Sequence, residues 1–72
     1  MNYEQIKEIG KFIQDERKKL NLTQEELANK ICVTSKAVSK WENGHGLPNI
    51  DCMISLAETF NISINELLAG KR

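Results

Sequence analysis

Residues 23–44 read TQEELANKICVTSKAVSKWENG, and this stretch decides the fold. Thr23 is followed three residues later by Glu26, a capping box that predicts the start of a helix. Thr34 can cap another helix after a short break. Two short helices separated by so tight a break form a helix-turn-helix over about residues 24–43.

Three further segments show helical spacing of apolar residues. We expect a long amphipathic helix over residues 3–20 and another after the capping residue Asn49. Ser63 and Glu66 form a second capping box, which opens a short last helix. No segment alternates as a strand does, so we predict an all-α fold of five helices. The apolar stripes are expected in the core, and they include Ile9, Ile13, Leu20, Leu27, Ile50, Met53, Ile54, Phe60, Leu67 and Leu68.

The length and composition indicate one small domain. With 72 residues the chain is predicted to form a single domain over residues 1–70, followed by a frayed tail of Lys71 and Arg72. No apolar run approaches the roughly 20 residues that a membrane span needs. The N-terminus lacks a basic stretch before an apolar one, which argues against a signal peptide. We expect a cytoplasmic protein that does not contact a membrane.

The cysteines and the histidine predict neither a metal site nor a cofactor. Cys32 and Cys52 are the only cysteines and His45 is the only histidine, so a zinc site would lack its four ligands. We expect two buried thiols in a reducing compartment and no disulfide.

The charges are balanced in number but unevenly distributed. Ten basic residues match ten acidic ones, a balance that argues mildly against a nucleic-acid partner. Residues 34–45, however, carry Lys36 and Lys40 against one acid, whereas residues 46–70 carry three acids and no base. One face can therefore attract phosphate while the opposite one repels it.

The second helix of the pair has two unlike sides. At about 100° per residue, its polar residues fall within one arc about 140° wide: Ser35, Lys36, Ser39, Lys40 and Asn43. Thr34, Ala37, Val38 and Trp41 fall on the opposite arc, and Glu42 lies at the flank. We expect the apolar arc to pack inward, with Trp41 as an anchor. The polar arc could meet a DNA major groove, or it could merely solvate an exposed helix.

Nearly the whole chain, from residue 9 to residue 68, resembles the phage-repressor class of helix-turn-helix proteins (Cro/CI, or XRE). The matching residues are Ile9, Gly10, Ile13, Arg17, Leu22–Ala28, Val33–Val38, Trp41–Gly44, Pro48, Leu56–Ala57, Ile62–Ser63 and Glu66–Leu68. The resemblance implies a compact five-helix, lambda-repressor-like domain that binds operator DNA.

The resemblance also assigns roles to individual residues. Ser35, Lys36 and Lys40 match positions that face base edges. The positions expected to contact the DNA backbone are Gln24, Thr34, Ser39, Asn43 and Gly44. Gln24 is expected to bond a phosphate or to brace a recognition-helix residue. Arg17 and Glu42 match positions that form a structural ion pair.

Two residues depart from the family pattern. Cys32 stands where a glycine is usual in the tight turn, and Asn21 stands where glycine is common. A left-handed backbone at Cys32 would carry strain of about 1 kcal/mol or more.

The prediction is therefore a sequence-specific transcriptional regulator, a repressor that acts as a homodimer on an inverted-repeat operator of double-stranded DNA. The alternative is a protein-interaction module of the same fold, which binds an antitoxin- or antirepressor-type partner through its acidic side. An enzyme is a poor fit, because no nucleophile motif is present.

Overall fold

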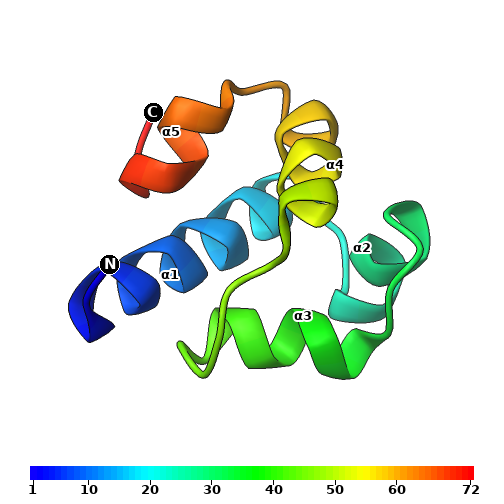
Figure 1. Cartoon of the computed structure of the whole chain (residues 1–72). Coiled ribbons are helices and arrows are strands. Elements are labelled where there is room, and N and C mark those ends of the chain that lie inside the picture. The colour runs from blue at the N-terminus through cyan, green and yellow to red at the C-terminus, as the bar shows by residue number, and fades with distance from the viewer.

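The computed structural model describes residues 1–72 and consists of five helices without a strand. The helices are α1 (Tyr3–Lys19), α2 (Gln24–Lys30), α3 (Ser35–Glu42), α4 (Ile50–Phe60) and α5 (Ile64–Ala69) (Figure 1). The predicted all-α class is confirmed. The predicted helix-turn-helix consists of α2 and α3.

Side chains cap the start of every helix. The four predicted capping residues each accept a hydrogen bond from the backbone N–H three residues further on, and they are Thr23, Thr34, Asn49 and Ser63. Asn2 and Gln5 form a further capping box at the start of α1, which we did not predict. Such caps contribute about 1 kcal/mol each, and they need only local sequence.

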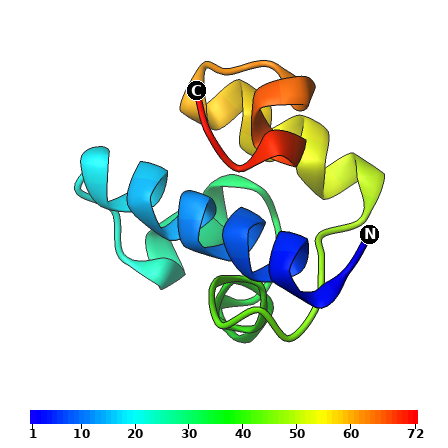
Figure 2. The ribbon, with the colours of Figure 1, turned by 90° about the vertical axis from the view of Figure 1, so that its left-hand side faces the viewer.

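The helices are arranged around α1. It packs against α3 on one side and against α5 on the other, while α2 packs on α3 and α4 on α5. Figure 2 shows α1 crossing the middle of the molecule, with α3 below it and the α4–α5 pair above. One side of α3 is therefore left without a covering element.

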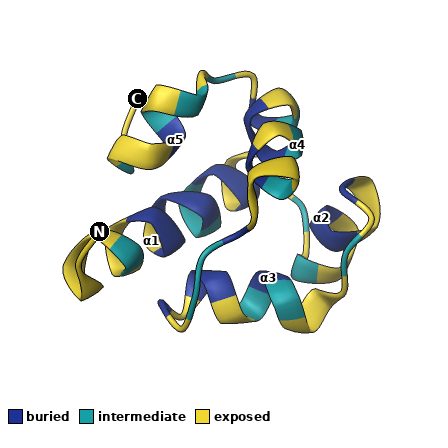
Figure 3. Cartoon of the chain, in the orientation of Figure 1, coloured by how far each residue is buried: buried dark blue, intermediate teal, exposed yellow.

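The core takes at least one side chain from each helix. The most deeply buried apolar residues are at most 1% exposed, and they are Ile9, Ile13, Leu27, Ala28, Val38, Leu56 and Leu67. Figure 3 shows the buried residues concentrated where the helices face one another. None of the five helices has the length and apolar character that crossing a bilayer would require.

Four residues predicted for the core lie at the surface instead. Ile50 is 62% exposed because it is the first residue of α4, and Ile54 is 45% exposed because it lies at the edge of the stripe formed by Met53, Leu56, Ala57 and Phe60. Leu20, at the end of α1, is 46% exposed and Leu68 in α5 is 38% exposed. Helical periodicity identified the helices correctly but made their buried stripes too wide.

The turn between α2 and α3 contains a strained residue. Cys32 has φ +61°, the left-handed conformation considered above. The other left-handed residues are all asparagine or glycine: Asn21, Gly44, Asn61 and Gly70. Those residue types tolerate this conformation, whereas a cysteine in it costs about 1 kcal/mol or more.

The prediction of two buried thiols is wrong. Cys32 is exposed and Cys52 only half-buried, and both are free. For Cys32 the physical reason lies in the backbone, since tight turns run over the surface and a side chain there has little to pack against. Cys52 lies within α4 and packs only partly against the core.

The prediction of a frayed tail is wrong for Arg72. Its guanidinium contacts Glu16 of α1, with Nη2 2.6 Å from Oε1, and it also donates to the carbonyl of Phe60 at 3.2 Å. Lys19 contacts the other oxygen of Glu16 at 3.0 Å. Burial raises the pKa of the Glu16 carboxyl, but the hydrogen bonds from Arg72 and Lys19 outweigh it and leave the pKa below its ordinary value.

Candidate nucleic-acid interface

The inward side of α3 is anchored as predicted. Val38 is fully buried, and Trp41 is 6% exposed, so the tryptophan packs in the core. Thr34 was placed on this inward arc by the helical wheel, and that placement is wrong. It is exposed and lies before the helix, where its hydroxyl accepts a hydrogen bond from Ala37 at 3.1 Å.

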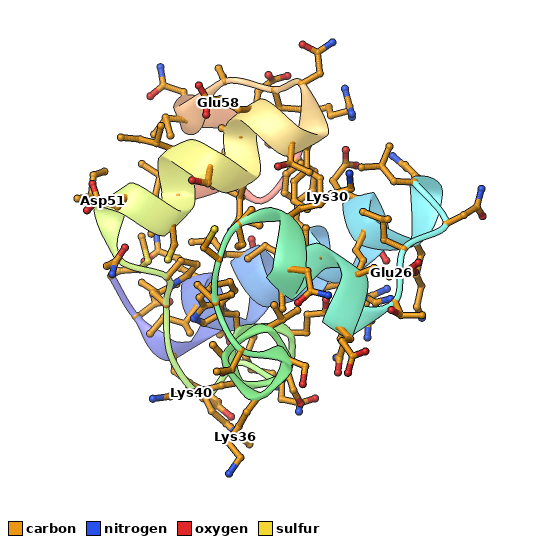
Figure 4. All side chains as sticks on the ribbon, turned by 90° about the vertical axis from the view of Figure 1, so that its right-hand side faces the viewer. Glu26, Lys30, Lys36, Lys40, Asp51 and Glu58 are labelled. Atoms are coloured by element: carbon orange, nitrogen blue, oxygen red, sulfur yellow. The ribbon has the colours of Figure 1, made fainter.

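The outward side of α3 carries the residues expected to face base edges. Ser35, Lys36 and Lys40 are exposed, and Ser39 is half-buried. Figure 4 shows Lys36 and Lys40 extending from the same side of the molecule, away from the core. The structure thus brings these side chains together on one accessible helix face.

Acidic residues lie on the other side of the molecule. Figure 4 places Asp51 and Glu58, both on α4, far from the two α3 lysines. Both acids are exposed. The charge division expected along the sequence is therefore also a division in space, with a lysine-bearing α3 face and an acidic α4 side.

An ion pair fastens α1 to the end of α3. Arg17 donates from Nε to Glu42 Oε2 at 2.7 Å and from Nη2 to Oε1 at 3.0 Å, a two-pronged pair predicted from the resemblance. The Glu42 side chain is 0% exposed, so its expected place at the flank of the helix is corrected to the interior. The hydrogen bonds with Glu42 raise the pKa of Arg17, which keeps the guanidinium charged.

Gln24 adds a third group to this pair. Its Nε2 donates to Glu42 Oε1 at 3.0 Å, so it links the first turn of α2 to the last turn of α3. Of the two expected roles, bracing a recognition-helix residue is the one present in this structure. Arg17 also donates to the carbonyl of Leu22 at 2.8 Å, which ties the start of the helix-turn-helix to the same cluster.

The loop after α3 holds the remaining predicted contacts. Asn43 is exposed, and its Nδ2 donates to Ser39 Oγ at 3.3 Å along the outward side. Gly44 is buried with φ +74°, and a Cβ atom there would lie 2.8 Å from Lys7 Cγ. His45, the next residue in the chain, is exposed.

Sequence reasoning missed the part that Gly10 plays. This residue lies inside α1, where glycine costs about 1 kcal/mol relative to alanine, and such a glycine often signals a packing role. In the structure it faces the last turn of α3, with no room for a side chain between the helices. No group of three or more metal-ligating side chains is assembled anywhere in the fold.

Comparison of the sequence with known proteins finds a helix-turn-helix family model and several transcriptional regulators. The sequence model described as helix-turn-helix matches residues 13–67. The HTH-type transcriptional activator BcrR of Enterococcus faecalis is 41% identical over 64 residues, which cover 89% of this chain and 31% of that protein. The cryptic phage CTXphi transcriptional repressor RstR of Vibrio cholerae is 34% identical, over 82% of this chain and 53% of its own length. The chain thus spans about a third to a half of these two relatives.

Solved structures give the same architecture. The P22 c2 repressor, in complex with a synthetic operator, superposes with a TM-score of 0.83 at 32% identity, over 88% of this chain and 96% of that one. The restriction-modification controller protein C.AhdI of Aeromonas hydrophila superposes with a TM-score of 0.81 at 25% identity, over 90% and 94%.

Proposed function

The chain belongs to the helix-turn-helix family, and we propose that it is a DNA-binding transcriptional regulator whose α3 enters the major groove of an inverted-repeat operator. This family is one of DNA-binding regulators rather than enzymes. A cytoplasmic location, where the DNA of a bacterium or phage lies, goes with the proposal. Repression is the form of regulation that we favour, because the P22 c2 protein with its operator is a repressor.

The observation that carries the proposal is the two-sided construction of α3. One side is fixed in the core by Val38 and Trp41, and the other side exposes Lys36 and Lys40, neither of which forms an ion pair. A lysine can donate to guanine O6 and N7 as well as to phosphate oxygens. A rigidly mounted helix can therefore present the same donors to each operator.

The proposed DNA contacts fall into two groups, those to base edges and those to the DNA backbone. We assign Ser35, Lys36 and Lys40 to base edges because all three are exposed on the outward side of α3 and match the family positions that face bases. Backbone contacts are assigned to residues at or beside the helix ends, which are Gln24, Thr34, Asn43 and the Gly44 backbone, and to Ser39 within α3. Phosphate contacts fix the register of a protein on DNA without reading sequence.

A homodimer is part of the proposal. One domain of this size presents few cations, and two copies would place their α3 helices in grooves about 34–36 Å apart. The apolar residues of α5 are candidates for the dimer interface. Leu67 is 0% exposed and belongs to the core, so Leu68, which is 38% exposed, is the residue we propose. Analytical ultracentrifugation of wild type and Leu68→Lys, with and without a palindromic duplex, tests this part.

A second candidate function rests on the acidic side. The chain has a net charge of zero, with Asp51 and Glu58 exposed on α4, and a basic protein partner could bind there. The same fold could serve both purposes on opposite sides. Binding to a partner that Asp51→Lys abolishes while operator binding persists would separate the two functions.

The experiment that tests the main proposal is selection of bound sites from a genomic-fragment library, followed by titration of the selected duplex at several salt concentrations. We expect an inverted repeat and an affinity that falls steeply with salt, with a slope of about −0.9 per phosphate contacted. Lys40→Ala should cost about 1–3 kcal/mol on the selected site and blur one base position. Absence of binding at low salt would overturn the proposal.

A further inference from the structure

We infer that Gly46 is a specificity-determining residue that acts through Lys40, by leaving the space in which the Lys40 side chain lies against the α3–α4 loop. This inference rests on the proposed function, since Lys40 is taken to face a base edge. Under this inference Gly46 contacts no DNA. It is a positioning residue for the Lys40 side chain.

The loop after α3 folds back over the helix end. Gly44 donates its N–H to the carbonyl of Trp41 and His45 donates to that of Lys40, both at 3.0 Å. The left-handed backbone of Gly44 makes this reversal possible. The chain then runs on through Gly46 beside the outward side of α3, next to the Lys40 side chain.

The two glycines of this loop are there for different reasons. Gly44 needs its left-handed φ of +74°, which only glycine and a few other residues adopt readily. Gly46 is not left-handed, so backbone conformation does not require a glycine there. What remains to explain Gly46 is space.

The space at Gly46 is taken by one side chain. A Cβ atom added there would have three nearest neighbours, and all belong to Lys40: Cε at 2.9 Å, Nζ at 3.6 Å and Cδ at 3.7 Å. The first distance is shorter than real Cβ contacts. Any residue other than glycine would therefore displace the end of the Lys40 side chain from this position.

The consequence concerns how Lys40 contacts a base, not the stability of the fold. A lysine side chain has many rotamers, so its ammonium can point in many directions unless its surroundings favour one of them. Gly46 leaves room for the rotamer in which the Lys40 side chain lies along the α3–α4 loop, and in that rotamer its ammonium is presented in a defined direction. Because the atoms displaced by a Cβ are the end of a flexible side chain, Gly46→Ala should leave the fold intact.

The test is a set of three backgrounds: wild type, Lys40→Ala and Lys36→Ala, each with and without Gly46→Ala. Affinities are measured on the selected operator and on duplexes carrying single base changes. In wild type and in Lys36→Ala, we expect Gly46→Ala to reduce preference for the selected base at the Lys40 position about three- to tenfold. In Lys40→Ala, we expect the change to be less than about twofold. Lys36→Ala is the matched control, because Lys36 lies on the same face and none of its atoms is among the three nearest to a Cβ at Gly46.

A readout without DNA separates this inference from the proposed function. In the free protein, the ¹H and ¹³C signals of the Lys40 Cε methylene should shift in Gly46→Ala, while those of Lys36 and the unfolding midpoint remain unchanged. Equal losses of affinity in all three backgrounds, or no loss in any, would overturn the inference. Failure of the wild type to bind any duplex would instead overturn the proposed function.

Discussion

Gly10 of α1 lies directly against the carbonyl of Trp41 in α3, so closely that a Cβ atom on Gly10 would overlap the carbonyl oxygen and stand 3.1 Å from its carbon. The neighbouring carbonyl oxygen of Glu42 would be 3.3 Å away. The obstacle is backbone on both sides, which cannot move aside as a side chain can. The crossing of α1 and α3 is therefore fixed at a distance that only glycine permits.

Gly10→Ala should push the two helices apart and lower the free energy of unfolding by about 1–3 kcal/mol or more. Lys11→Ala is the matched control, because that side chain is exposed and its ion pair with Asp15 is worth about 0.5 kcal/mol at most. Urea unfolding of both variants measures the difference. A Gly10→Ala protein more stable than wild type, as helix propensity alone would favour, would contradict the close crossing.

The parts of the fold that sequence could predict are those decided locally. Thr23, Thr34, Asn49 and Ser63 cap their helices because each needs only residues three positions away. Gly10 and Arg72 behave otherwise, since their partners lie far along the chain and no spacing rule connects them. Burial was predicted least well for α4, where a very apolar helix leaves Ile50 exposed.

The candidate site follows the same division. Periodicity predicted which side of α3 faces outward, because one turn of helix decides it. The pairing of Arg17 with Glu42 could be predicted only through the family resemblance, since the two residues are 25 positions apart. The space that Gly46 leaves for Lys40 had no signal in the sequence, because it depends on how the loop folds back.

The Arg17–Glu42 pair predicts a non-additive mutant cycle. Arg17→Met leaves the fully buried Glu42 carboxylate with Gln24 as its only hydrogen-bond partner, and should cost about 3–5 kcal/mol. Adding Glu42→Leu removes the stranded charge, so the double variant should be more stable than Arg17→Met alone. Thermal and urea unfolding of the cycle measure this. Additive losses would mean that the two groups act independently.

Glu16 predicts acid sensitivity of a definite sign. Its pKa is lowered in the folded protein, so its contribution to stability is present above the unfolded pKa of about 4.3 and is lost as pH falls through the lower folded value. Glu16→Gln should therefore be less stable than wild type at pH 7 and lose less stability between pH 7 and pH 3.

Unfolding by urea at the two pH values checks this prediction for Glu16. Glu58→Gln is the control, because Glu58 is exposed and forms no ion pair in the structure. Equal acid sensitivity in wild type and Glu16→Gln would show that other carboxyls determine the acid limit.

We expect Gln24→Ala to lower the affinity for DNA without changing the preference between base sequences. Gln24→Ala removes the hydrogen bond to Glu42 and the proposed phosphate contact, neither of which reads a base. Binding to the selected operator and to single-base variants should weaken by a similar factor. Gel-shift titrations of both duplex sets measure it. A base-dependent loss would place Gln24 among the reading residues, and unchanged affinity would remove it from the interface.

Cys32 predicts that stability increases when glycine replaces it. The residue adopts φ +61°, and relief of about 1–2 kcal/mol of strain is partly offset by the roughly 0.5–1 kcal/mol that glycine loses in chain entropy. Because the side chain is exposed, no packing is lost with it. Cys32→Val should be destabilised, since a branched side chain is worse in this conformation. Asn21→Gly is the control and should gain less, because asparagine already tolerates φ +58°. The order glycine, cysteine, valine in unfolding temperature is the expected result, and any reversal of cysteine and valine would argue that the turn is not strained.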